Sequence, residues 1–114
     1  MAKNEELNIQ SDIVSYLRLN NILVFSVPNG SYFARVATRM LMRRSGLLSG
    51  VSDLIIVLKN KVVFAEIKTP KGRQSDNQKE FEHKVTKLGF SYEIWRSLDD
   101  AINWYKEFNN GRTN

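Results

Sequence analysis

The sequence contains no cysteine and a single histidine. The absence of cysteine excludes disulfide bonds and thiolate zinc sites, and one histidine cannot supply a cluster of imidazole ligands. A chain without cysteine fits a reducing compartment. No apolar run approaches the roughly 20 residues of a membrane-spanning helix, and residues 1–6 carry no hydrophobic signal region. We therefore expect a cytoplasmic protein without a membrane partner.

Proline and glycine are also scarce, with two and six residues respectively, and they form no linker. The sequence has no internal repeat and no low-complexity segment, so we expect residues 1–114 to form a single domain. Acidic residues are in the minority: 12 Asp and Glu stand against 17 Lys and Arg, which gives a net charge of +5. This balance favours a polyanionic partner such as nucleic acid.

Apolar runs and turn residues divide the sequence into alternating helices and strands. Residues 5–19 have apolar positions at helical spacing, whereas residues 54–58 and 62–67 are short apolar runs typical of strands. Strands that are apolar on both faces imply helices on both sides of a sheet. The expected α/β order is a helix over residues 5–19, a strand over 23–27, a basic helix over 33–44, strands over 54–58 and 62–67, a helix between Ser75 and Gly89, a strand over 90–95 and a final helix capped by Ser97.

The two central strands predict a hairpin whose register has chemical consequences. Asn60 tolerates the positive φ of a tight turn, and a two-residue turn of Lys59 and Asn60 pairs Leu58 with Lys61. The same register places Asp53 opposite Glu66, with Cβ atoms about 5 Å apart. A slip of one residue would move the two acids to opposite faces of the sheet.

Lys68 follows Glu66 by two residues and therefore projects from the same face of the sheet. Two carboxylates and a lysine can bind a divalent cation and activate a water for phosphodiester hydrolysis. The alternative is that Asp53 and the Glu-x-Lys pair are ordinary solvated charges at strand ends. Glu66, however, interrupts an apolar strand, where an unpaired charge is expensive and a cation or a lysine would remove the penalty. Gln78 has two interpretations, because a capping box with Ser75 would explain it without any role in the site.

These residues resemble a known family. Gly50-Val51-Ser52-Asp53, Glu66-Ile67-Lys68 and Gln78, with Pro28-Asn29-Gly30 upstream, resemble the VRR-NUC domain (virus-type replication-repair nuclease), a branch of the PD-(D/E)xK nuclease superfamily. The resemblance implies a restriction-endonuclease-like α/β core, α-β-β-β-α-β, with a mixed sheet flanked by helices. One departure is Ser52, where the family usually has proline or another small residue.

The resemblance also implies roles for individual residues. Asp53 and Glu66 would bind Mg²⁺ or Mn²⁺, and the backbone carbonyl of Ile67 would add a ligand. Lys68 would position or activate the attacking water, and Gln78 would lie close to the site from the next helix. The acid of the leading helix matches Glu6 better than Glu5, which makes Glu6 a further candidate metal ligand.

The basic residues form two groups in the sequence. The first lies in the basic helix, where Arg35, Arg39 and Arg43 share one face, and the second flanks the end of the Glu-x-Lys strand. Such runs are commonly solvated faces, but few acids lie near this one, and we interpret both groups as contacts to DNA phosphates. No base-reading pattern is present, so DNA shape is the expected target. The candidate DNA-binding residues are Arg35, Arg39, Arg43, Arg44, Lys71, Arg73 and Lys79.

Stand-alone members of the resembled family are similar to phage or viral enzymes of replication and repair, which would act in the cytoplasm of the host cell. By that analogy we expect a homodimer that cuts branched DNA such as four-way (Holliday) junctions. The alternatives are a nickase or exonuclease of DNA repair, or a non-catalytic basic DNA-binding module. The first helix and residues 31–48 are candidate dimer surfaces. The second is rich in apolar residues that could instead complete the monomer core: Tyr32, Phe33, Met40, Leu41, Met42, Leu47 and Leu48.

Overall fold

The computed structural model describes residues 2–28 and 36–113. Helices and strands follow one another in the expected order. The bounds are α1 (Ala2–Leu19), β1 (Leu23–Ser26), α2 (Val36–Arg44), β2 (Leu54–Leu58), β3 (Lys61–Ile67), α3 (Asp76–Lys87), β4 (Ser91–Trp95) and α4 (Leu98–Thr113). The basic helix expected from residue 33 is thus observed as α2, and its expected first residues, 33–35, lie outside the described part of the chain.

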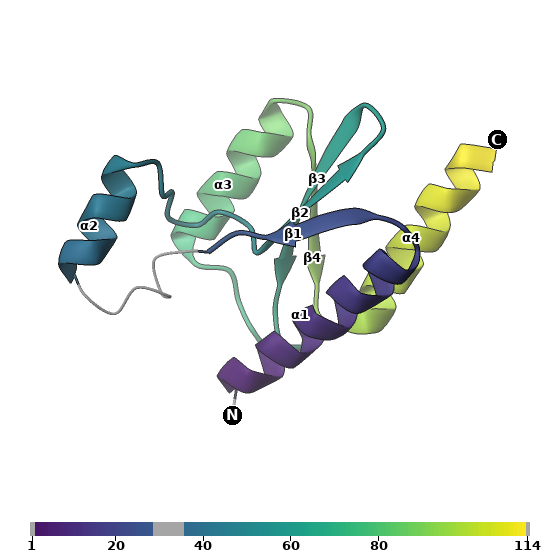
Figure 1. Ribbon diagram of the computed structural model, residues 1–114, viewed down its shortest axis with the longest axis horizontal. Coiled ribbons are helices and arrows are strands. Elements are labelled where there is room, and N and C mark those ends of the chain that lie inside the picture. The colour runs from purple at the N-terminus through teal and green to yellow at the C-terminus, as the bar shows by residue number, and fades with distance from the viewer. Residues whose placement is uncertain (1, 29–35, 114) are drawn as a thin grey trace.

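The strands form one mixed sheet in the order β1-β2-β3-β4. The first three strands are antiparallel neighbours, and β4 pairs parallel with β3. A parallel pair needs a crossover connection, which α3 provides. Helices α1 and α4 lie against one face of the sheet and α3 against the other (Figure 1). The observed architecture is therefore the predicted α/β fold with a mixed sheet flanked by helices.

The core lies between the sheet and the pair α1 and α4. Alternate residues of each strand point to this face, as the two-residue period of a strand requires. Ile13 and Leu17 of α1 and Ala101 of α4 pack against these strand residues, and all three are fully buried. The buried strand residues of this layer are Val24, Leu54, Ile56, Val63, Ala65, Ile67 and Trp95.

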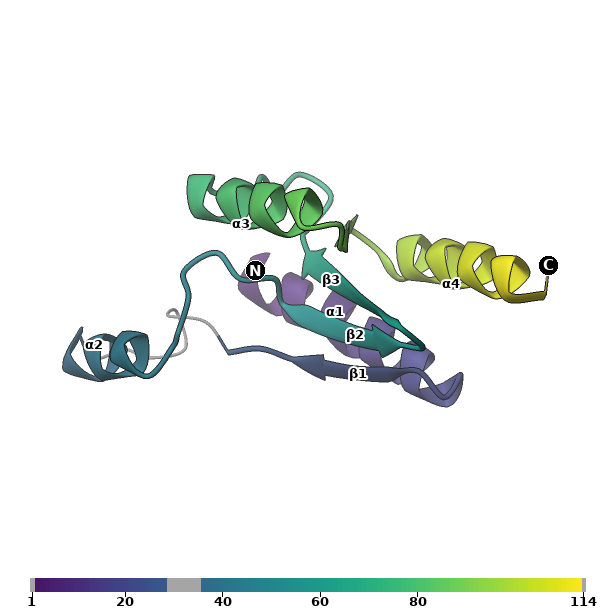
Figure 2. The same ribbon diagram turned by 90° about the horizontal axis from the view of Figure 1, so that it is seen from above.

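The opposite face of the sheet is only partly covered. Helix α3 covers the β3–β4 half, where Phe81 meets Phe64 edge-on at 5.4 Å. Over β1 and β2, Leu23 is 60% exposed, and Phe25 is also exposed. Helix α2 does not cover this half, because it stands to one side of the sheet (Figures 1 and 2). The expectation of helices on both sides of the sheet therefore holds for β3 and β4 but not for β1 in the described structure.

The hairpin has the predicted register. Leu58 pairs with Lys61, and Leu54 with Ala65 is the last pair of the ladder, so the same register carried one residue further sets Asp53, just before β2, against Glu66. Asn60 adopts a φ of 59°, the left-handed conformation that was expected of it. The sheet therefore brings the two acids to the same end of neighbouring strands.

Gly50 joins the segment before β2 to the first turn of α3. Its φ is +85°, and a Cβ atom placed on it would lie 2.3 Å from the backbone oxygen of Asn77. No side chain fits into that gap, because the obstructing atom belongs to the backbone. Gly50 therefore allows the segment that carries Asp53 to pack directly on α3.

We predict that Gly50→Ala lowers the free energy of unfolding more than Gly89→Ala does. Gly89 is the matched control, because its φ is +94° and a Cβ there would meet no atom of the described residues within 4 Å. The control should lose only the penalty of a left-handed residue, about 1–2 kcal/mol, whereas the overlap at Gly50 should add about 1–3 kcal/mol. Urea denaturation of both variants measures the difference, and equal losses would contradict the close packing on α3.

Candidate active site

Asp53 is fixed at the start of β2 by the two strands on either side. Its Oδ2 accepts a hydrogen bond of 2.7 Å from the backbone N–H of Ile67 on β3. Its backbone carbonyl accepts another, of 2.9 Å, from the N–H of Val27 beyond β1. The carboxylate is therefore held at the end of the sheet by main-chain geometry.

Glu66 lies opposite Asp53 and is buried, with a side chain only 1% exposed. Its Oε1 accepts a hydrogen bond of 2.5 Å from the hydroxyl of Tyr92. Its Oε2 is buried and has no hydrogen-bond partner among the described residues, and Lys68 Nζ lies 3.9 Å from it. A buried carboxylate oxygen without a donor is unfavourable, so this atom is available for a cation.

The acids influence one another electrostatically. Burial raises the pKa of Asp53 above its ordinary value, although the hydrogen bond from Ile67 and the charge of Lys68 act against it. Burial also raises the pKa of Glu66, against the hydrogen bond from Tyr92 and the charge of Lys68, while the charge of Asp53 adds to the increase. A raised carboxyl pKa means that the charged form is disfavoured, and a bound cation would relieve that penalty.

Glu6 belongs to the same electrostatic group. Its pKa is raised by burial first, then by the charge of Asp53, and further by Glu66, while Lys68 lowers it. Glu6 is therefore near these groups, whereas Glu5 lines a separate cavity next to the site. This agrees with the preference for Glu6 as the acid of the leading helix, but its role as a ligand stays a prediction.

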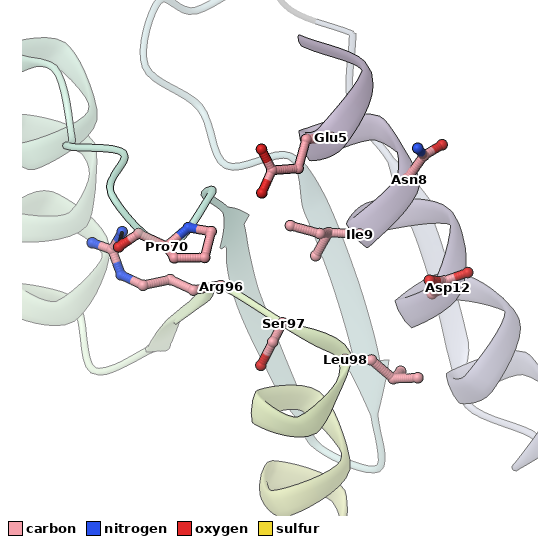
Figure 3. A pocket seen from close by; sticks show the side chains of 8 residues that line it. All are labelled: Glu5, Asn8, Ile9, Asp12, Pro70, Arg96, Ser97 and Leu98. Carbon is pink, nitrogen blue, oxygen red and sulfur yellow. Dashed lines mark hydrogen bonds between the residues drawn. The ribbon is translucent and has the colours of Figure 1, made fainter. Parts of the chain in front are cut away.

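The cavity next to the site has a volume of about 470 Å³ and lies between α1 and the start of α4 (Figure 3). The Arg96 side chain extends from the end of β4 towards Pro70, on the side of the cavity away from α1. Its Nη1 donates hydrogen bonds to the backbone carbonyls of Thr69, at 2.8 Å, and of Gly72, at 2.7 Å. Arg96 therefore holds the turn that follows Lys68, a role that its position at the end of a strand did not reveal.

The donor set suits a hard divalent cation such as Mg²⁺, because it consists of carboxylate oxygens and no sulfur or imidazole. The orphaned Oε2 of Glu66, with Asp53 opposite on the next strand, fits such an ion. No cluster of three or more His, Cys, Asp or Glu side chains able to hold a metal is found among the described residues. Further ligands would then include the Ile67 carbonyl and water, which Mg²⁺ commonly retains.

Gln78 forms the predicted capping box. Its Oε1 accepts a hydrogen bond of 2.8 Å from the N–H of Ser75, whose Oγ accepts one of 3.2 Å from the N–H of Gln78. The capping interpretation is confirmed, and a role for Gln78 in the site stays a prediction. Ser52, at the position where the resembled family usually has proline, is buried and donates a hydrogen bond from Oγ to the Leu54 carbonyl.

Two residues near Glu66 were missed by the sequence reasoning. Tyr92 reads as a core residue of a strand, yet its hydroxyl binds Glu66. Gln74 donates from Nε2 to Glu82 Oε1 at 2.9 Å and, more weakly, to the Tyr92 hydroxyl at 3.5 Å. Neither residue carries a spacing signal, because the contacts depend on the parallel pairing of β4 with β3.

The candidate DNA-binding residues lie in two places. Arg39, Arg43 and Arg44 are on α2, where the last two are exposed and Arg39 is half-buried, and Arg35 lies outside the described residues. Exposed basic side chains also occupy the turn after β3 and the first turns of α3. These are Lys71, Arg73 and Lys79.

None of the helices in the described part of the chain combines the length and the hydropathy that a membrane crossing requires. Among proteins with curated descriptions, none matches the sequence. A solved structure described as a VRR_NUC domain protein is similar in fold, with a TM-score of 0.73 and 18% sequence identity. The similarity covers 90% of this chain and 86% of that chain.

The family model of the VRR-NUC domain matches residues 4–99. The matched residues make up most of the chain. They include the β2–β3 hairpin and the site residues Glu6, Asp53, Glu66 and Lys68. The chain belongs to the VRR-NUC family, whose members are nucleases of the PD-(D/E)xK type.

Proposed function

We propose that this protein is a deoxyribonuclease dependent on Mg²⁺ or Mn²⁺, and that it cuts branched DNA such as four-way junctions as a homodimer. The observation that carries the metal-dependent activity is Glu66. No hydrogen-bond donor of the described residues reaches its buried Oε2, which lies next to Lys68, and the register of the hairpin sets Asp53, just before β2, against Glu66. An uncompensated carboxylate in a sheet is expensive unless it serves a ligand.

Asp53 and Glu66 would hold the cation, and each keeps one oxygen on a protein donor. Asp53 Oδ2 binds the Ile67 N–H, and Glu66 Oε1 binds the Tyr92 hydroxyl. When bound, the cation lowers the pKa of a coordinated water and polarises the scissile phosphate. Lys68, whose side chain is 12% exposed, would orient the water and offset the charge that develops on the phosphate.

We predict that Asp53→Ala, Glu66→Ala and Lys68→Ala each reduce Mg²⁺-dependent cleavage by about 10²–10³-fold, the usual effect of removing one stabilising group. The fold and DNA binding should remain. The control is Glu80→Ala, which removes an exposed carboxylate of α3 that pairs with Lys84. A panel of single-strand, duplex, flap and four-way-junction DNA measures activity. Full activity of Glu66→Ala with Mg²⁺ would contradict the mechanism. Loss of DNA binding in any of the three variants would indicate that the residue binds phosphate instead.

DNA binding is assigned to the basic side chains around the site. The turn after β3 carries exposed cations close to Lys68, and α2 presents Arg43 and Arg44 on a helix that stands apart from the sheet (Figure 2). Together they would contact phosphates on both sides of a branch point. Contacts of this kind position DNA without reading its sequence.

We predict that Arg39→Glu and Arg43→Glu weaken DNA binding without changing metal affinity. Each lost phosphate contact should reduce the slope of log affinity against log salt by about one unit. Lys59→Glu is the control, because Lys59 is an exposed cation in the hairpin turn, at the opposite end of β2 from Asp53. If the salt slope of both α2 variants equals that of the wild type, α2 is a solvated face and does not bind DNA.

The homodimer is supported by the apolar surface that the fold leaves open. Met40 and Leu41 on α2 and Leu48 after it are more than half exposed, so they do not complete the monomer core. The uncovered half of the sheet adds Leu23 and Phe25. A four-way junction needs cuts on two strands, and a two-fold dimer supplies two related sites. The second copy would bury this surface.

We predict a dimer mass for the wild type in light scattering at micromolar concentration, with and without junction DNA. Exchange of both Met40 and Leu41 for Glu should shift the mass to that of a monomer, because charges would enter an apolar interface. Leu88→Glu is the control, since Leu88 is 75% exposed at the end of α3, outside this surface. A monomer mass in both states, with junction cleavage first order in protein, would rule out the paired sites.

A further inference from the structure

Tyr92 approaches the candidate metal ligand from the neighbouring strand. In the parallel pair, Phe64 is opposite Tyr92 and Glu66 is opposite Ile94, so Tyr92 and Glu66 lie diagonally on one face. The Tyr92 ring packs beside the Phe81 ring, with 6.3 Å between the ring centroids. The Tyr92 hydroxyl lies 2.5 Å from Glu66 Oε1. A hydrogen bond this short to a carboxylate is of the strong, charge-assisted kind.

The direction of this hydrogen bond is determined by the groups around the hydroxyl. A phenol has one proton to donate, and a side-chain amide N–H can only donate. Gln74 Nε2 contacts the hydroxyl at 3.5 Å, and Gln74 is itself held by Glu82 Oε1 at 2.9 Å. The hydroxyl therefore accepts from Gln74 and gives its proton to Glu66 Oε1.

The two oxygens of Glu66 are thus unequal. Oε1 is occupied by Tyr92, while Oε2 is buried, has no donor in the described part of the chain and lies 3.9 Å from Lys68 Nζ. Rotation of the carboxylate away from Tyr92 would break this bond and leave a half-buried hydroxyl without its acceptor, which is unfavourable. The protein therefore presents one oxygen of Glu66 and withholds the other.

We propose that Tyr92 is a positioning residue that reserves Glu66 Oε1, so that Glu66 gives only Oε2 to a divalent cation and the site discriminates against Ca²⁺. This inference rests on the proposed function. Mg²⁺ and Mn²⁺ favour octahedral sites of oxygen ligands, and Mg²⁺ demands near-ideal geometry. Ca²⁺ takes more oxygen ligands and readily binds both oxygens of one carboxylate. A carboxylate with one oxygen withheld suits the smaller ions.

The test is the ratio of Mn²⁺ to Ca²⁺ affinity, measured by calorimetric titration of the full chain without DNA. Tyr92→Phe keeps the ring against Phe81 and removes the hydroxyl. Its Mn²⁺ affinity should fall by about 10-fold, the usual effect of losing a partner of a metal ligand, while its Ca²⁺ affinity stays equal or rises. Gln74→Ala should shift the ratio in the same direction by less. If Tyr92→Phe does not fold, the affinity ratio of Gln74→Ala tests the inference in its place.

The matched control is Tyr105→Phe on α4, where the ring meets Tyr16 edge-on at 5.9 Å, and it should leave the ratio unchanged. A purely structural role of Tyr92 would weaken both ions together, and an unchanged ratio in Tyr92→Phe and in Gln74→Ala would overturn the inference. Glu66→Ala separates the two hypotheses. If it abolishes Mn²⁺ binding while those ratios stay unchanged, only the role of Tyr92 fails. If it leaves Mn²⁺ binding intact, the proposed function fails as well.

Discussion

The antiparallel pairing of β2 with β3 is the constraint on which the candidate site depends. It sets Asp53 opposite Glu66, and the Ile67 N–H then reaches across to Asp53 Oδ2 at 2.7 Å. A strand repeats every two residues, so a slip of one position would send one acid into the apolar core beside α1 and the other towards α3. The other side chains of the site join this pair from three places: Glu6 from α1, Tyr92 from β4 and Lys68 from the residue just after β3.

Holding these charges at the edge of the core works against stability. Glu66 is fully buried. Burial disfavours the charged form of a carboxyl group, and it therefore raises the pKa of Glu66, Asp53 and Glu6. Lys68 and Tyr92 compensate only in part, since no donor in residues 2–28 or 36–113 binds Glu66 Oε2. Such an uncompensated charge is common where a site is shaped for a ligand rather than for the empty fold.

The hairpin could be predicted from sequence because its signals are local. Asn60 marks the turn, the apolar runs mark the strands, and the register follows from the turn alone; the capping box of Ser75 and Gln78 is equally local. The contacts of Tyr92 and Arg96 could not be predicted, because they depend on β4 returning parallel to β3 after a helix. The open face of β1 could not be predicted either. Its apolar residues follow the same pattern as covered strands, and only the placement of α2 away from the sheet distinguishes them.

The backbone around the site is held at several independent points, whereas α2 is set apart from the sheet. Gly50 seats the segment before Asp53 on α3, and Arg96 holds the turn after Lys68 through two carbonyls. Groups that must act on one phosphate need to be positioned within a fraction of an ångström, and anchored backbone provides that. A helix that contacts a branched duplex or a second subunit has a different requirement, because it must present exposed charged and apolar side chains beyond the core. The separation of α2 from the sheet therefore follows from the two tasks that we assign to the chain: rigid chemistry at the hairpin, and contact with large partners at its side.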